Sequence, residues 1–451
     1  MAADNNNEEA RQYVLRSAQE NDVKFIRLWF TDILGNLKGF AITVAELEGA
    51  MEKGMSFDGS TVAGFARRDE SDMVAMPDPT TFSILPWRPR QNAVARMFCD
   101  ILRPTGEPFE GDPRHVLKIA LGRAADLGFE FQVGPELEHF YLKSADDPTP
   151  LDVGGYFDLT TPLDTASDLR RETVLSLEEM GIPVEYSHHE VANSQHEIDL
   201  RHTDALTMAD TVMTYRQVVK EVAMSRGVYA TFMPKPFEKL TGNGCHAHVS
   251  LWNGNVNKFL DKSDRYGLNK MAYNFLGGII KNAQSLSAFF NPTINSYRRI
   301  NAPATKSGAS WSPSSISYSG NNRTHMIRIP DPGRFELRLM DGSANPYLLQ
   351  ASIAAAGLYG IDNKSDPGEL LTCNMYTDYE NYPNLERLPD DLYESLEKLN
   401  ENKIVKEAFG EEVVNSYLKL KKKELNDFET ENVFDKEGSI TDWEKNNTLD
   451  C

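Results

Sequence analysis

Residues 134–140 read Gly134-Pro135-Glu136-Leu137-Glu138-His139-Phe140, an alternation of acidic side chains with mostly apolar ones. In a β-strand, residues two positions apart point to the same face of the sheet. Glu136 and Glu138 therefore share one face, while Leu137 and His139 take the other. The alternation predicts a strand that holds two carboxylates side by side on a polar face.

Three further segments carry polar side chains with related spacing. They supply His246, His248 and Ser250 within residues 245–250, Arg334, Glu336 and Arg338 within 333–339, and Glu190 and Glu197 around a short turn in 188–197. Any one of these strands could be the wet face of an ordinary sheet, since half-solvated antiparallel sheets are common. Four together favour a functional site, because glutamate, histidine and arginine are the residue types that bind divalent metals and phosphate.

The crowded carboxylates predict a metal site. Acidic groups packed closely repel one another and take up protons unless a cation neutralises them. Oxygen-rich sites with an occasional imidazole suit Mg²⁺ or Mn²⁺ better than a tetrahedral zinc. His246 and His248 alone would carry little weight, because a lone strand histidine is more often structural. With the glutamates, they lead us to expect Mg²⁺ (or Mn²⁺) as the cofactor.

Arginines gather late in this acidic chain, and they are Arg298, Arg299, Arg323, Arg328, Arg334 and Arg338. Guanidinium groups beside a metal site are the expected clamp for a phosphoryl group in transfer. A surface position is the plainer interpretation, which we accept for Arg298. The sequence contains neither GxxxxGK followed by Ser or Thr nor GxGxxG, so neither familiar glycine loop would hold the phosphate.

The composition is that of a globular protein, with 40% hydrophobic and 25% charged residues among 451. This length suffices for two or three domains. The net charge of −20 argues against nucleic acid or an anionic membrane surface as the main partner. A small anion such as ATP stays compatible with it, because local arginines and a bridging metal can hold one.

Nothing in the sequence predicts export or membrane insertion. The first residues are acidic and polar, whereas a secretory signal has a basic start and an apolar core. The most apolar long stretch, residues 347–361, is shorter than a membrane span and is interrupted by Gln350 and Ser352. The four cysteines lie far apart without a CxxC pair. We read them as reduced thiols and expect a cytoplasmic protein.

Short strands lie between recurring helical patterns, which predicts the α+β class with a large second domain. Residues 103–106 read Arg-Pro-Thr-Gly, a turn cluster and candidate boundary. Pro113 then opens an amphipathic helix. We predict an N-terminal domain over residues 1–104 and a second domain over residues 105–451.

Taken in order, the motifs resemble the glutamine synthetase family of the bacterial type across nearly the whole chain. The seven-residue step from Glu190 to Glu197, and the absence of a long insertion before residues 154–157, resemble its shorter subtype. The matching segments are Phe57-Asp58-Gly59-Ser60, Glu70-Ser71-Asp72-Met73, Gly134-Pro135-Glu136-Leu137-Glu138, His188-His189-Glu190-Val191-Ala192, Ala230-Thr231-Phe232-Met233-Pro234-Lys235-Pro236, Asn291-Pro292-Thr293, Asn295-Ser296-Tyr297, Asn322-Arg323, Ile327-Arg328-Ile329-Pro330 and Ala344-Asn345-Pro346-Tyr347-Leu348.

The resemblance implies both a fold and an assembly. It implies an N-terminal β-grasp domain over residues 1–104. It implies a C-terminal catalytic domain over residues 105–451, with a curved antiparallel sheet and flanking helices. Members of the family are homo-oligomers, so the resemblance further implies a dodecamer of two hexameric rings with each active site between neighbouring subunits.

The same resemblance assigns roles to residues, with two or three Mg²⁺ (or Mn²⁺) ions per site. It assigns one metal to Glu138, Glu190 and Glu197, and the other to Glu136, His246 and Glu336. It assigns catalytic roles to Asp58, Arg299, Arg323 and Arg338, with Asp58 acting from a neighbouring subunit on ammonium. It assigns glutamate binding to Glu138, Gly242, His246 and Arg299. It assigns ATP binding to Phe232, His248, Ser250, Arg328 and Arg334.

These roles imply an ATP-dependent ligase. A carboxylate is a poor acyl donor, because its leaving group would be oxide. Phosphorylation by ATP turns the glutamate side chain into an acyl phosphate, whose leaving group is phosphate. A neutral amine can then attack, provided that a nearby carboxylate takes up its proton. The predicted substrates are glutamate, ATP and a small amine, and the product is a γ-glutamyl amide.

One loop departs from the family pattern. Family members carry a flap glutamate after the arginine that binds the substrate carboxylate, but Thr305 stands at its place here. No Asp or Glu occurs from residue 300 to residue 322, and the loop is six residues longer than the family spacing. Thr241 is a second departure, since an asparagine normally helps to hold the substrate there. The pocket has thus lost a charge that favours a compact ammonium ion, whereas an alkyl group could pack against Trp311.

We therefore predict a small primary amine such as methylamine as the acceptor, as in the variant branch of the family that makes γ-glutamylmethylamide. Ammonia, as in type III glutamate–ammonia ligases, stays open as the alternative. A catalytically inactive structural or regulatory relative is a further alternative, although a dead site has no reason to keep costly buried carboxylates. A two-metal phosphatase or nuclease is disfavoured by the negative charge of the chain.

Overall fold

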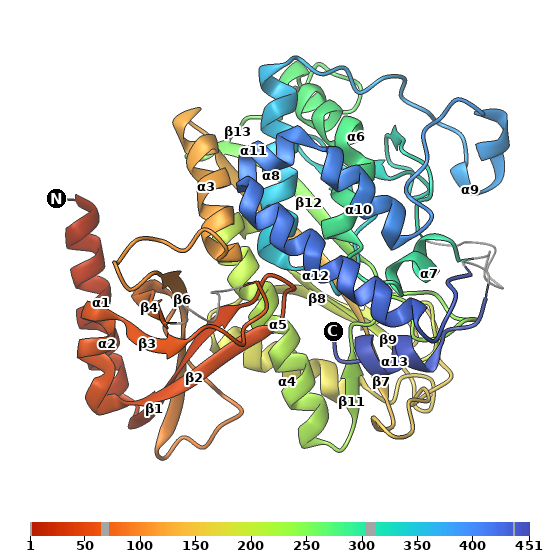
Figure 1. Ribbon diagram of the computed structural model, residues 1–451. Coiled ribbons are helices and arrows are strands. Elements are labelled where there is room, and N and C mark those ends of the chain that lie inside the picture. The colour runs from red at the N-terminus through yellow and green to blue at the C-terminus, as the bar shows by residue number, and fades with distance from the viewer. Residues whose placement is uncertain (1, 65–71, 303–311, 436–437) are drawn as a thin grey trace. The chain divides into compact units, whose positions relative to one another are not determined.

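The computed structural model describes residues 2–64, 72–302, 312–435 and 438–451. It divides into two compact units, formed by Met1–Val116 with Leu175–Ile182 and by Leu117–Val174 with Pro183–Cys451. Both units combine helices with a sheet (Figure 1), which confirms the α+β class. Thr305 and Trp311 of the variant loop lie outside the described residues. The predicted division between residues 104 and 105 stays a prediction.

The first unit is built around a six-stranded sheet in the order β2–β1–β6–β4–β3, with β5 paired to β6. Strands β1 and β6 run parallel, and the other pairs are antiparallel. Its elements are α1 (Ala2–Glu20), β1 (Val23–Thr31), β2 (Leu37–Thr43), η1 (Val44–Glu46), α2 (Leu47–Lys53), β3 (Met55–Asp58), β4 (Asp72–Pro77), η2 (Pro79–Thr81), β5 (Ser83–Ile84) and β6 (Ala93–Leu102).

Alternation along the central strands explains the core of this unit. Ile26 and Leu28 of β1 point to one face and are buried, as is Met97 of β6 beside them. Leu47 and Met51 of α2 belong to the same apolar cluster. Burial of such side chains contributes roughly 1.5–3 kcal/mol each to folding.

The second unit contains a ten-stranded sheet in the order β14–β15–β16–β12–β7–β9–β8, with β10 and β11 also paired to β7 and β13 to β12. Within this sheet β14 and β15 pair in parallel, and the other described pairs are antiparallel. The strands are β7 (Glu130–Leu142), β8 (Val184–His189), β9 (Gln195–Leu200), β10 (Thr203–Asp204), β11 (Tyr229–Thr231), β12 (Cys245–Asn253), β13 (Val256–Asn257), β14 (Tyr318–Ser319), β15 (Ile327–Arg328) and β16 (Phe335–Leu337).

The remaining helices follow along the chain. They are α3 (Pro113–Asp126), α4 (Ser167–Glu179), α5 (Ala205–Ser225), α6 (Lys270–Phe290), α7 (Ser296–Ile300), α8 (Pro346–Asp362), α9 (Met375–Asp378), η3 (Tyr379–Asn381), α10 (Leu392–Glu401), α11 (Lys403–Phe409), α12 (Glu411–Glu429) and α13 (Asp442–Thr448). Helices α3 and α4 have residues in both units. The predicted start of a helix at Pro113 is confirmed. Within the described ranges, no helix combines the length and apolarity needed to cross a membrane.

Helices α6 and α8 pack closely (Figure 1), and small residues make this possible. A Cβ atom added at Gly278 of α6 would lie 2.0 Å from the carbonyl oxygen of Ala356, and one at Gly360 of α8 would lie 2.2 Å from that of Asn274. Neither position has room for a methyl group, so glycine sets the distance between the two helices.

Candidate active site

The register of neighbouring strands gathers the polar faces predicted from the sequence. Across β7 and β12, Glu136 lies opposite His246. Across β7 and β9, Glu138 lies opposite Glu197. Side chains on directly opposed residues are 4.5–5.5 Å apart at Cβ, so these pairings bring ionisable groups from separate parts of the chain into one site.

The first group of possible ligands consists of Glu136, His246 and Glu336, whose nearest donor atoms all lie within 4.8 Å of one another. His246 Nδ1 lies 3.2 Å from Glu136 Oε2 and 3.8 Å from Glu336 Oε1. His248 Nε2 lies 2.6 Å from the other oxygen of Glu136. The structure thus brings together the three residues that the family resemblance assigns to one metal.

The second group consists of His188, Glu190 and Glu197. His188 Nε2 lies 3.9 Å from Glu197 Oε2. The resemblance assigns Glu138 to this metal, and Glu138 lines one cavity together with these three residues. It accepts a hydrogen bond from the backbone N–H of Gly244 at 2.7 Å. His188 was not predicted as a site residue, although it stands two positions before Glu190 on the strand that leads to it.

Crowding opposes ionisation in the second group. Burial and the charge of Glu190 raise the pKa of Glu138 to about 8. Burial, Asp199 and Glu190 raise the pKa of Glu197 well above its usual range. Carboxylates held this close would retain protons near neutral pH unless a cation neutralised them.

In the first group, by contrast, the surroundings favour ionised carboxylates. Burial alone would raise the pKa of Glu136, but hydrogen bonds from His246 and His248 outweigh it and hold that pKa below its usual range. Burial is likewise outweighed for Glu336, where Arg338 and His246 lower the pKa to about 2. Burial and Arg338 lower the pKa of His246 to about 4, so its imidazole is neutral near pH 7.

These donors fit a divalent ion. Ionised carboxylates with a neutral imidazole are the ligand set that Mg²⁺ or Mn²⁺ accepts. Nε2 of His246 is buried and has no hydrogen-bond partner among the described residues, so this imidazole has one nitrogen that no protein group satisfies. Burial and the neighbouring carboxylates raise the pKa values of Glu138 and Glu197, and a bound cation would favour the ionised form of both.

Arginines flank the first group. Arg338 is buried and pairs with Glu336, while Arg328 Nη1 lies 2.8 Å from the other oxygen of that carboxylate. Arg323 is exposed. Arg334 is about 41% exposed and pairs with Asp331.

Two adjoining cavities share Glu136, Tyr186 and Arg323 in their walls. The smaller, of about 150 Å³, holds the carboxylates and is lined by Glu136, Glu138, Tyr156, Tyr186, His188, Glu190, Val191, Gln195, Glu197, Thr241, Gly242, His246, Arg323 and Arg338. The larger, of about 310 Å³, is lined by Gly134, Pro135, Glu136, Glu185, Tyr186, Asp199, Leu200, His202, His248, Ser250, Trp252, Asn257, Asn321, Arg323, Arg328, Pro330, Asp331, Pro332 and Arg334.

Arg299 lies behind the smaller cavity. It is buried and donates to the carbonyl oxygen of Leu339 at 3.0 Å. A Cβ atom at Gly244 would lie 2.9 Å from its Nη2, and one at Gly242 would lie 3.0 Å from its Cγ. Glycine at these two positions therefore lets the chain pass beside the arginine.

Asp58 belongs to the first unit, and Phe232 belongs to the core of the second. Asp58 is exposed at the end of β3 in the first unit and accepts a hydrogen bond from the backbone N–H of Ser60 at 2.8 Å. Phe232 is fully buried, with its ring near His139 and Tyr215, and lines neither cavity. Its side chain is part of the core, so any contact with a ligand would have to use its backbone.

Sequence reasoning missed Gln195, which joins several parts of the site. Its Nε2 lies 3.1 Å from Glu138 Oε2 and 3.0 Å from the carbonyl oxygen of Gly242. Its Oε1 accepts from the Thr241 hydroxyl at 2.9 Å. The available signal for Gln195 was its place in the sequence, between Glu190 and Glu197 in the segment 188–197. Tyr156, Tyr186 and Asp199 also line the cavities without having been predicted.

Comparison with known proteins adds the family. Residues 22–104 match the family described as "Glutamine synthetase, beta-Grasp domain", and residues 110–444 match "Glutamine synthetase, catalytic domain". A glutamine synthetase of Clostridium saccharobutylicum is 42% identical over 450 residues, covering 97% of this chain and 98% of its own. One of Methanosarcina mazei is 45% identical over 429 residues, covering 93% and 94%.

Solved structures are similar over the same length. A structure described as "GmaS/ADP complex-Conformation 1" matches with a TM-score of 0.87 at 37% identity, covering 97% of this chain and 99% of the other. A second, described as "Apo GmaS without ligand", matches with a TM-score of 0.85 at 36% identity, covering 96% and 98%. Both domains of the chain therefore have counterparts of known fold.

Proposed function

The chain belongs to the glutamine synthetase family and is an ATP-dependent ligase, and from this premise we propose that it joins the side-chain carboxyl of glutamate to a small amine through a γ-glutamyl phosphate. One observation carries the proposal. Six acid or imidazole side chains line a single cavity, namely Glu136, Glu138, His188, Glu190, Glu197 and His246, and Glu336 contacts His246 and Arg338 beside it.

We assign Mg²⁺ or Mn²⁺ to these groups, with two or three ions per site. One ion would be held by Glu136, His246 and Glu336, and another by Glu138, Glu190 and Glu197, with His188 as a further donor. Bound ions would neutralise the oxygens of the transferring phosphate. Burial and crowding of Glu138 and Glu197 raise both pKa values, and they support this assignment because a divalent cation would stabilise the ionised carboxylates.

The larger cavity suits the nucleotide. His248, Ser250, Arg328 and Arg334 lie in or beside its wall, and we assign them to ATP, with Phe232 contributing backbone atoms. Arg323 is shared with the smaller cavity, so it and Arg338 could face the phosphate that passes between the two. The similar structure that is described as an ADP complex supports a nucleotide at this site.

We assign glutamate to the smaller cavity. Arg299 would bind a carboxylate of the substrate, and Gly242 and Glu138 would contact its polar atoms, with His246 close by. The amine must be neutral to attack the acyl phosphate, so a carboxylate has to take up its proton. We assign this task to Asp58 of a neighbouring subunit, in agreement with its exposure.

Methylamine is our choice of acceptor. The cavity wall beside Glu190 includes Tyr156, Tyr186 and Val191, whose apolar surfaces suit an alkyl substituent. The segment 300–322 contains no acidic residue, which removes one charge that favours a compact, strongly hydrated cation. Both features favour a methylated amine over ammonia.

Ammonia is the second candidate. The relatives from Clostridium saccharobutylicum and Methanosarcina mazei are described as glutamine synthetases at 42% and 45% identity. The carboxylates of this chain would also attract ammonium. A non-catalytic relative is less favoured, because the costly buried acids are all present.

We further propose a cytoplasmic homo-oligomer, a dodecamer of two hexameric rings, with domains over residues 1–104 and 105–451. The exposed position of Asp58 supports an assembly in which a neighbouring subunit completes the site. The boundary is supported by the family matches, which end at residue 104 and resume at residue 110.

Phosphate release tests the proposed reaction. Purified protein would receive glutamate, ATP and Mg²⁺ with ammonia, methylamine, ethylamine, putrescine or ethanolamine, and Glu138→Gln protein prepared identically would serve as the blank for contaminating phosphatases. We expect kcat/KM for methylamine to exceed that for ammonia by about tenfold, which corresponds to roughly 1.4 kcal/mol of discrimination. Preference for ammonia would overturn the acceptor but not the ligase. ATP binding without turnover on any amine would favour the non-catalytic alternative.

A further inference from the structure

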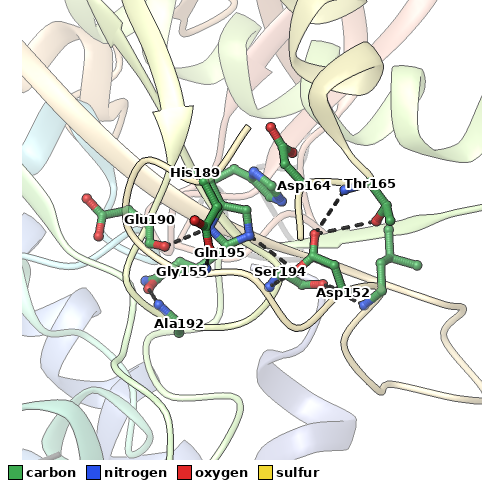
Figure 2. A network of polar contacts seen from close by, with 12 residues as sticks. Asp152, Gly155, Asp164, Thr165, His189, Glu190, Ala192, Ser194 and Gln195 are labelled. Carbon is green, nitrogen blue, oxygen red and sulfur yellow. Dashed lines mark hydrogen bonds and ion pairs between the residues drawn. The ribbon is translucent and has the colours of Figure 1, made fainter. Parts of the chain in front are cut away.

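A buried polar network lies behind the turn that joins β8 to β9 (Figure 2). The side chains of Asp152 and His189 are fully buried, and Asp152 Oδ1 lies 3.2 Å from His189 Nε2. The other ring nitrogen of His189, Nδ1, lies 2.7 Å from the carbonyl oxygen of Glu190. Both ring nitrogens face oxygen acceptors, so an imidazolium can donate to both. The contact links Asp152 to the backbone of a proposed metal ligand.

The same carboxylate holds the far end of the turn. The backbone N–H of Ser194 donates to Asp152 Oδ1 at 2.7 Å. The Ser194 hydroxyl accepts from the backbone N–H groups of Leu151 and Asp152 at 2.5 and 3.0 Å. Ser194 has a φ of 61°, which is unfavourable for a residue other than glycine and persists only where the surroundings enforce it. The hydrogen bond to Asp152 holds Ser194 in this conformation.

Hydrogen bonds within the turn connect the residues held by Asp152 to Glu138 in the wall of the cavity. The backbone N–H of Glu190 donates to the carbonyl oxygen of Gln195 at 2.7 Å, and that of Gln195 donates to Ala192 at 3.0 Å. The Gln195 side chain then donates to Glu138 at 3.1 Å. Asp152 therefore clamps both ends of a turn that is flanked by Glu190 and Glu197.

Metal binding is the competing interpretation of this network, because Asp152, His189 and His196 offer donor atoms within 4.8 Å of one another. Arg170 argues against it. Its Nη1 lies 2.7 Å from His196 Nδ1, and its guanidinium also pairs with Asp164 at 2.7 Å. The positive guanidinium beside His196 would repel a metal ion there, so the contacts favour a hydrogen-bonded network.

We propose that the Asp152–His189 pair is a positioning device, which clamps the Glu190–Gln195 turn from behind and so holds Glu190 and Glu197 in the geometry that binds the metal. The inference rests on the proposed function, since it concerns the same site. Neither residue lines the cavities, so both act through the turn. Partners that orient metal ligands typically change metal affinity or activity by 10- to 100-fold when they are removed.

Mn²⁺ binding to the nucleotide-free protein, followed by electron paramagnetic resonance, tests the pair without relying on turnover. Asp152→Asn removes the charge at constant volume. His189→Asn keeps a donor toward the Glu190 carbonyl and loses the one toward Asp152. We expect each variant to weaken Mn²⁺ binding by roughly 10- to 100-fold. The double variant should be about as weak as the single ones, because the two residues act as a unit.

Asp210→Asn is the matched control. Counted over the whole residue, Asp210 and Asp152 are each 6% exposed, and Asp210 accepts from the hydroxyl of Tyr347 on α8 at 2.6 Å. This variant should lower the thermal midpoint and leave Mn²⁺ affinity unchanged. In the Asp152 and His189 variants, excess Mn²⁺ should restore turnover, which a general loss of folding would not allow.

Ser194→Gly is a milder variant in case the buried-pair variants do not fold. Glycine accepts the φ of 61° and removes only the hydroxyl that fixes residues 151 and 152. It should weaken Mn²⁺ binding by roughly threefold or more. Unchanged Mn²⁺ affinity in every folded variant would overturn the positioning role and leave the proposed function standing. Failure of the unmodified protein to bind Mn²⁺ would overturn both.

Discussion

Two glutamates on one strand show how strongly the surroundings decide the state of a side chain. Glu136 and Glu138 share a face of β7, yet their pKa values shift in opposite directions. Glu136 faces two imidazoles, whose hydrogen bonds favour its ionised form. Glu138 is buried beside Glu190, so both desolvation and charge repulsion oppose ionisation. The same residue type is thus favoured in its ionised form at position 136 and in its protonated form at position 138.

Glu138→Gln tests whether the Glu138 carboxylate is needed for metal binding and turnover. The amide keeps the shape but cannot carry the negative charge that the proposed metal needs. We expect turnover to fall by roughly 100-fold or more and Mn²⁺ binding to weaken in parallel. Steady-state phosphate release and metal titration would measure both. Turnover within about threefold of the unmodified enzyme would remove Glu138 from the metal site.

At the scale of elements, glycine controls how α6 packs against α8. The added Cβ atom at Gly278 would approach a carbonyl oxygen to 2.0 Å, so the helices must separate to admit it. Gly122 of α3 offers a contrast, because nothing lies within 4 Å of a Cβ atom placed there. The two positions share a residue type and a helical conformation but differ in their neighbours.

Gly278→Ala should therefore destabilise the protein by about 1–3 kcal/mol, the usual cost of overpacking a filled interior. Gly122→Ala should stabilise it by roughly 0.5–1 kcal/mol, since alanine is the better helix former in open space. Chemical denaturation of both variants beside the unmodified protein would measure the two values. Equal effects of the two substitutions would mean that the α6–α8 contact is not tight.

At the scale of the whole molecule, the acids of the site should make stability depend on pH and metal. The pKa of Glu138 is about 8 when folded, whereas an exposed glutamate titrates near 4.5. Between these values the folded protein keeps a proton that the unfolded chain has lost. Stability contributed by this group is therefore greatest below about pH 4.5 and falls as pH rises toward 8.

Glu138→Gln isolates this contribution, since its side chain does not titrate. With EDTA present, we expect the variant to gain thermal stability over the unmodified protein as pH rises from 5.5 to 8.5, by a few degrees at the upper end. Added Mg²⁺ should stabilise the unmodified protein more than the variant, and more so at the higher pH, because binding displaces the proton of Glu138. Scanning calorimetry would follow both effects. A difference that does not vary with pH would contradict the raised pKa.

Local patterns in the sequence determined the class of the fold and the kinds of side chain in the site. The alternation at residues 134–140 predicted a strand with two glutamates on one face, and β7 contains it. Pro113 marked the first residue of α3. Such features depend on neighbours within a few positions, which is why they can be read without a structure. The ordered motifs added the family, which the comparisons show.

The tertiary structure alone decided which of these side chains meet. Strand register placed Glu136 opposite His246, more than a hundred residues away, and brought His188 rather than Glu138 into the closest group with Glu190 and Glu197. It buried Phe232 in the core. It also paired Asp152 with His189, and no local periodicity links these two residues. Contacts over such separations arise from packing and loop closure, and a local pattern carries no record of either.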